Sequence, residues 1–88
     1  MTETEKQLLD NVFDALDRLF DGETEAIDVH ALIFATARAL PQSSFLRILD
    51  ETADRLLEVV RSGLTIDEAR GRALDVTDEL RGVLADAM

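Results

Sequence analysis

The sequence predicts an all-α protein, an antiparallel four-helix bundle made of two helical hairpins. Apolar residues recur at steps of three and four in four separate segments, which is the period of a helix buried on one side. Three breaks separate these segments, at Gly22, at Pro41 and at Ser62-Gly63. With 88 residues, the chain is expected to form a single helical domain over 1–88. The absence of cysteine excludes disulfides, thiolate zinc sites and cysteine nucleophiles.

The first segment, about 4–21, is predicted to be an amphipathic helix. Thr2 and Glu5 have the spacing of a capping box at its start. Gly22 follows the segment, where a left-handed residue commonly ends a helix. The apolar stripe of this helix consists of Leu8, Leu9, Val12, Phe13, Leu16, Leu19 and Phe20.

The second segment, about 26–40, is predicted to be a helix that is apolar over more than half of its circumference, and Thr24 or Glu25 leads into it. Such a helix either lies at the centre of its bundle or is covered by a partner. One face carries Ala26, Val29, Ile33, Ala37 and Leu40. The flanking residues, which form a possible apolar interface, are Ile27, Leu32 and Phe34.

The second hairpin is predicted over about 44–86. Its first helix has Ser43 or Ser44 as a possible N-cap, and Thr65 with Glu68 forms a capping box at the start of the last helix. The apolar residues of the third helix are Phe45, Ile48, Leu49, Ala53, Leu56, Leu57, Val59 and Val60. Those of the fourth form a heptad-like seam of Ala69, Ala73, Val76, Leu80 and Val83.

The two predicted hairpins echo each other at a spacing of about forty residues. An internal duplication would explain this echo, and so would two amphipathic hairpins of similar composition. The matching positions are Leu9, Asp10, Asp14 and Leu16 with Leu49, Asp50, Asp54 and Leu56.

A net charge of −10 argues against nucleic acid and anionic membranes as direct partners and favours a basic protein. The chain has no apolar run of about 18 residues, which a membrane-spanning helix requires. The absence of cysteine, and of the basic and apolar regions of a signal peptide, predicts a cytoplasmic protein.

No catalytic, cofactor or metal constellation stands out, so the sequence predicts a protein that is not an enzyme. His30 lacks a Glu three residues before it, which a di-iron bundle requires. The acids between Asp17 and Glu25 do not have the spacing of a calcium-binding loop. His30 is therefore interpreted as a histidine beside the buried face that donates one hydrogen bond.

Two other families share single features with this chain. Helical nucleotide pyrophosphatases hold magnesium with acid pairs spaced like Glu51 with Asp54 and Asp75 with Asp78, but the rest of that pattern is missing. Acyl carrier proteins are similar in size and acidity, but no serine of this chain follows an Asp as their carrier serine does. Both hypotheses rank below protein binding.

Acidic residues gather around the first interhelical turn, with Arg18 as the only basic neighbour. Asp17 and Asp21 lie near a helix C-terminus, where the helix dipole disfavours negative charge. A solvated loop explains this pattern, and so does a surface that meets a basic protein. The predicted partner-binding residues are Asp14, Asp17, Asp21, Glu23, Glu25 and Asp28.

The segment Leu16-Asp17-Arg18-Leu19-Phe20-Asp21-Gly22-Glu23 resembles the helix, Gly-Glu turn and helix that open small acidic bacterial immunity proteins of the colicin D type. The resemblance covers about the first forty residues and implies a cytoplasmic helical protein that blocks a basic toxin by occluding its active site. It does not extend to the immunity proteins of DNase colicins, whose paired tyrosines are absent from a chain without Tyr. No motif matches residue by residue, so no binding residue is carried over.

Two functional hypotheses follow from these patterns. In the first, the protein is an immunity-type inhibitor of a basic toxin or nucleic-acid enzyme. In the second, it is a homodimeric structural or regulatory protein that uses the helix over 26–40 as its interface.

Overall fold

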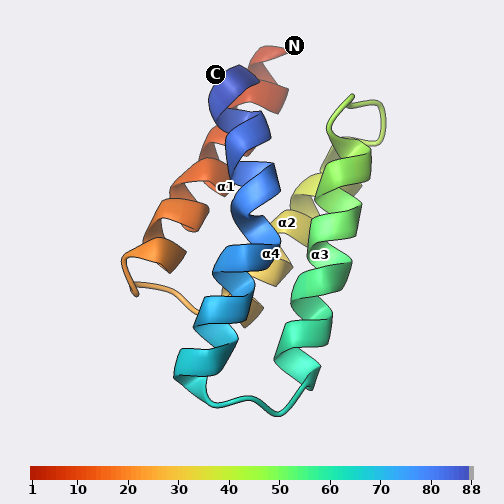
Figure 1. Ribbon diagram of the computed structural model, residues 1–88. Helices are drawn as coiled ribbons and strands as arrows, with labels where there is room; N and C mark the ends of the chain where they lie inside the picture. The colour runs from red at the N-terminus through yellow and green to blue at the C-terminus, as the bar shows by residue number, and fades with distance from the viewer. Residues whose placement is uncertain (88) are drawn as a thin grey trace.

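The computed structural model describes residues 1–87, which form four α-helices and no strand (Figure 1). The all-α prediction is confirmed, and the four helices lie close to the predicted bounds. The helices are α1 (Glu3–Phe20), α2 (Ala26–Ala39), α3 (Leu46–Arg61) and α4 (Ile66–Ala87).

The four helices pack as a bundle. Both α2 and α4 contact all three other helices, and α1 contacts α2 and α4. The most extensive contact joins α2 to α3, across the turn that contains Pro41. The radius of gyration is 12.2 Å, which agrees with the value of about 12 Å expected for a folded chain of this length. Met1 and the end of α4 lie at the same end of the molecule (Figure 1).

The core is built from aliphatic side chains of all four helices, as the apolar stripes predict. The predicted inner face of α2 is buried, with Leu40 packed against its edge. Burial accounts for only one face of α2, because Ile27, Phe34 and the alanines on the opposite face are exposed. The fully buried large side chains are Leu9, Val12, Leu16, Leu19, Val29, Ile33, Leu49, Leu56, Leu80 and Leu84.

Three buried threonines, Thr36, Thr52 and Thr77, interrupt this aliphatic core, and two of them pair their hydroxyls within their own helix. Thr36 donates to the carbonyl oxygen of Leu32, and Thr77 donates to that of Ala73, each at 2.8 Å. Each acceptor lies one helical turn earlier, so the polar atom is satisfied inside its own helix.

The end of α1 confirms the interpretation of Gly22 as a left-handed cap. Gly22 has a φ of 79°. Its N–H donates to the carbonyl oxygen of Leu19 at 3.2 Å, and that of Glu23 donates to Arg18 at 2.8 Å. These two bonds form a Schellman motif, which satisfies carbonyl groups that the helix end would otherwise leave free.

The capping box of α4 is confirmed. The Glu68 N–H donates to Thr65 Oγ1 at 3.2 Å, and the Thr65 N–H donates to Glu68 Oε1 at 3.3 Å. The Thr65 hydroxyl also donates to Glu68 Oε1 at 2.8 Å. These hydrogen bonds hold the pKa of Glu68 below its ordinary value, because they favour the ionised carboxylate.

At the start of α1, only half of the predicted capping box forms. The Glu5 N–H donates to Thr2 Oγ1 at 3.1 Å, as expected for an N-cap. The Glu5 carboxylate instead accepts from the Ser43 hydroxyl at 2.8 Å. That bond joins the first turn of α1 to the connection between α2 and α3.

The prediction that Ser43 or Ser44 caps α3 is wrong. The N-cap is Phe45, which makes no side-chain capping bond. The Ser43 hydroxyl accepts from the Phe45 N–H at 3.0 Å and donates to Glu5, so it stabilises the turn before the helix.

No helix within residues 1–87 is long and apolar enough to cross a membrane.

Candidate functional site

We define the acidic turn as the six predicted residues Asp14, Asp17, Asp21, Glu23, Glu25 and Asp28. Three of them, Asp21, Glu23 and Glu25, lie in the exposed connection that the Gly22 cap shapes. None of these three carboxylates forms an ion pair with any of the residues described. The connection between α1 and α2 therefore presents alternating, unneutralised negative charges to solvent.

The other three carboxylates of the acidic turn have partners. Asp14 pairs with Arg18 Nε at 3.2 Å on the surface of α1. Asp17 Oδ1 lies 2.6 Å from Arg81 Nη2 of α4 and forms an ion pair with it. The N–H does not point at this oxygen, so the pair has no aligned hydrogen bond. Asp28 accepts from Thr24 Oγ1 at 3.5 Å.

Two arginines of α4 reach α1 and its turn. The sequence around the turn does not indicate their positions, because both lie far along the chain. Arg81 pairs with Asp17, which offsets the unfavourable charge near the C-terminus of α1. The guanidinium of Arg70 lies against Gly22, 3.5 Å from the point where a Cβ would stand. Arg18 is therefore not the only cation near the acidic turn, because α4 packs beside α1.

Phe20 departs from its predicted position in the buried stripe of α1. Its side chain is 64% exposed, whereas Leu16 and Leu19 are fully buried. Phe13 and Phe20 lie two turns apart on the flank that faces α4. The guanidinium of Arg81 stands 6.0 Å from the Phe13 ring centre and 5.5 Å from that of Phe20.

The predicted apolar interface on α2 is divided by the fold. Ile27 and Phe34 are exposed on the outer face of the helix, two turns apart. Leu32 is half-buried and packs against the core, so it does not belong to that outer face. The Arg38 guanidinium covers part of Phe34, 4.9 Å from the ring centre.

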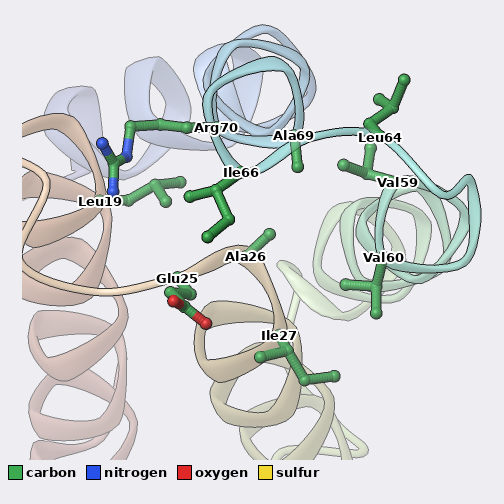
Figure 2. A pocket seen from close by; sticks show the side chains of 10 residues that line it. All are labelled: Leu19, Glu25, Ala26, Ile27, Val59, Val60, Leu64, Ile66, Ala69 and Arg70. Atoms are coloured by element: carbon green, nitrogen blue, oxygen red, sulfur yellow. The ribbon is translucent and has the colours of Figure 1, made fainter.

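An apolar hollow lies where the start of α2, the end of α3 and the start of α4 meet (Figure 2). Its volume is about 150 Å³. Ile66, which is 68% exposed, projects from α4 toward Ala26 in Figure 2. We define the end hollow by its full lining, which is Leu19, Glu25, Ala26, Ile27, Val59, Val60, Leu64, Ile66, Ala69 and Arg70.

Sequence reasoning missed the contribution of Leu64 and Ile66 to this hollow. Both are exposed apolar residues in or next to the turn between α3 and α4. Their one signal in the sequence is their position on either side of Thr65, directly after Gly63, where polar residues are usual.

His30 has the structural role that the sequence predicts. Its half-buried ring places Nδ1 2.8 Å from the carbonyl oxygen of Ala53. Because a carbonyl can only accept, Nδ1 is the donor, and the bond joins α2 to α3. The ring also lies 6.0 Å from that of Phe34.

Among residues 1–87, no three acidic or histidine side chains come together as a metal-binding group. Comparison of the chain with protein-family models, with curated proteins and with solved structures found no match.

Proposed function

We propose that this chain is a non-enzymatic protein-binding module, an immunity-type inhibitor that neutralises a basic toxin or nucleic-acid enzyme by occluding its active site. The observation that carries the proposal is the exposed, unpaired run of Asp21, Glu23 and Glu25 in the acidic turn. The proposed partner is a basic protein. In this proposal the chain itself contacts neither nucleic acid nor a membrane and uses no cofactor.

The electrostatics of the whole chain support this proposal. The chain has nineteen acidic residues, and only Asp14, Asp17 and Glu51 form ion pairs in the part that the structure describes. Such an excess of unpaired negative charge speeds encounter with a basic surface and repels nucleic acid. It also disfavours the compact state, so a partner that neutralises it gains affinity.

Co-purification from cells of the native host, followed by association kinetics, tests the proposal. The expected partner has a basic surface, and its association rate falls as sodium chloride is added, because salt screens electrostatic steering. Recovery of no basic partner, or an association rate that does not change with salt, contradicts the proposal.

A homodimer is the second candidate function, and the exposed apolar residues favour it. Ile27 lines the end hollow together with Val60, Leu64 and Ile66, and Phe34 lies two turns further along the outer face of α2. Exposed apolar surface of this kind often marks a protein–protein interface. In this arrangement the outer face of α2 meets a second copy of the chain.

Light scattering at micromolar concentration tests the dimer. A homodimer predicts twice the mass of one chain, and Phe34→Asp converts it to a folded monomer because the charge would be buried at the interface. A monomeric mass for the unsubstituted chain rules this candidate out.

We also propose a topology for the helices and a location for the protein. The four helices form an antiparallel bundle of two hairpins within a single domain, and the short connections support this topology. The protein acts in the cytoplasm, which the absence of cysteine supports.

A further inference from the structure

A second hollow lies between α1 and α4, beside the acidic turn. Its volume is about 250 Å³, and its lining includes Phe20, Asp75, Asp78 and Arg81. We call this surface the Phe20 groove. It combines an exposed aromatic ring from the end of α1 with two exposed carboxylates from α4.

The single cation of the Phe20 groove is already occupied within the fold. Arg81 pairs with Asp17 at 2.6 Å and lies near the rings of Phe13 and Phe20. Asp75 and Asp78 form no ion pair with any residue in the range 1–87. Two carboxylates of the groove are therefore left without a counter-charge, next to a ring that remains 64% exposed.

These groups have the chemistry that receives a guanidinium. An arginine side chain stacks on an aromatic face, and its N–H groups donate to carboxylates at the same time. Arg81 already lies 5.5 Å from the centre of the Phe20 ring, which shows that the ring accepts a guanidinium neighbour.

We propose that the Phe20 groove is the anchor point for an arginine side chain from a basic segment of the protein partner. The inserted guanidinium stacks on Phe20 and donates its N–H groups to the carboxylates of Asp75 and Asp78, while Asp17 keeps Arg81 in place. This inference rests on the proposed function and extends the binding surface from the acidic turn onto α4. It makes Phe20 the apolar centre of an otherwise acidic interface.

The occupant is an arginine of a protein for reasons of charge and shape. Phosphate-bearing partners are repelled by the carboxylates of the groove and by the net charge of −10. A wholly apolar occupant would leave both carboxylates facing it without a hydrogen-bond donor.

Titration of the full chain with an acetylated, amidated hexa-arginine peptide tests the groove. Binding is followed by backbone amide chemical shifts and by calorimetry, at low and at raised salt. The double variant Asp75→Asn/Asp78→Asn and the variant Phe20→Ala are expected to bind the peptide roughly fivefold more weakly than the unsubstituted chain. Amide shifts are expected to be largest around Phe20 and along the facing turns of α4.

The matched control is Asp50→Asn/Asp54→Asn on the exposed face of α3. It removes the same two charges from the chain but leaves the Phe20 groove intact. It is expected to weaken binding by less than twofold. Circular dichroism and the melting temperature of each variant establish that it folds.

The outcomes separate the groove from the proposed function. If the peptide binds in a salt-dependent way but the α3 control weakens it as much as the groove variants do, the groove is wrong and the acidic binding module stands. If Phe20→Ala folds and binds unchanged, the stacking contact is wrong. If the unsubstituted chain shows no salt-dependent binding of the peptide, the groove is wrong, whereas the proposed function is contradicted only when no basic partner is recovered from the native host.

Discussion

Gly22 shapes the acidic turn, because its backbone adopts a conformation that other residues avoid. Its φ of 79° lies in the left-handed region, where a side chain costs about 1–2 kcal/mol. We expect Gly22→Ala to lower the free energy of unfolding by about that amount, as measured by urea denaturation. An unchanged stability would contradict the role of Gly22 as the cap of α1.

Gly71 is the matched control for this substitution. It lies inside α4 with an ordinary helical φ, and nothing stands within 4 Å of an added Cβ. Gly71→Ala is expected to raise the free energy of unfolding by about 0.5–1 kcal/mol, because alanine loses less backbone entropy in a helix. The same substitution should therefore have opposite signs at the two glycines.

The cap at Gly22 could be predicted from the sequence because it depends on local pattern, and the position of His30 beside the buried face follows from helical periodicity, although its hydrogen-bond partner lies on another helix. The positions of Arg70 and Arg81 could not be predicted, since each side chain meets a residue that is distant along the chain. Phe20 was misplaced for a related reason. Its spacing fits the buried stripe, but it is the last residue of α1, where its ring packs beside Arg81 rather than in the core.

At the level of the helices, the capping box of α4 makes a pH-dependent contribution to stability. The hydrogen bonds from Thr65 lower the pKa of Glu68 from its ordinary value of 4.5. Because the pKa of Glu68 is lower in the folded state, its ionised carboxylate stabilises the protein at pH values above the unfolded-state pKa. That stabilisation is lost as the pH falls through the folded-state pKa. The loss therefore begins near pH 4.5 and is complete below the lowered pKa.

Glu68→Gln tests this contribution. Glutamine still offers an oxygen to Thr65 but does not titrate in this range. We expect the unsubstituted chain to be more stable than the variant at about pH 6, and the difference to shrink as the pH falls toward about 3. A difference in the free energy of unfolding that is independent of pH would contradict the ionised capping box.

Helix starts could be predicted from the sequence only where the caps are local. Thr65 with Glu68 satisfies this condition, since both partners lie in one turn. The start of α3 does not, because Ser43 bonds to Glu5 from a different helix. Phe45 is the N-cap of α3, and no local pattern signals the bond between Ser43 and Glu5.

The whole molecule carries far more negative charge than its ion pairs offset. Its net charge is −10, and residues 1–87 contain three ion pairs. Added salt screens the repulsion among the unpaired carboxylates and also weakens the exposed ion pairs. The loss from the ion pairs is the smaller effect, because each contributes only about 0–1 kcal/mol. We expect the melting temperature to rise between low and moderate sodium chloride, and a fall would show that attraction dominates.

The fold class, the four helices and the inner face of α2 could be predicted because hydrophobic periodicity reports them directly. The candidate surfaces could not be predicted to the same degree. The end hollow and the Phe20 groove are each assembled from helices distant in the sequence, so only the fold brings their residues together.

The most direct test of the proposed function is the association rate with the co-purified partner for two triple variants of equal charge. One variant neutralises the acidic turn with Asp21→Asn, Glu23→Gln and Glu25→Gln. The other neutralises exposed residues of α3 with Asp50→Asn, Asp54→Asn and Glu58→Gln. The proposal predicts that the turn variant associates about tenfold more slowly at low salt and loses most of its salt dependence, whereas the α3 variant changes little. Equal rates for the two variants would contradict it.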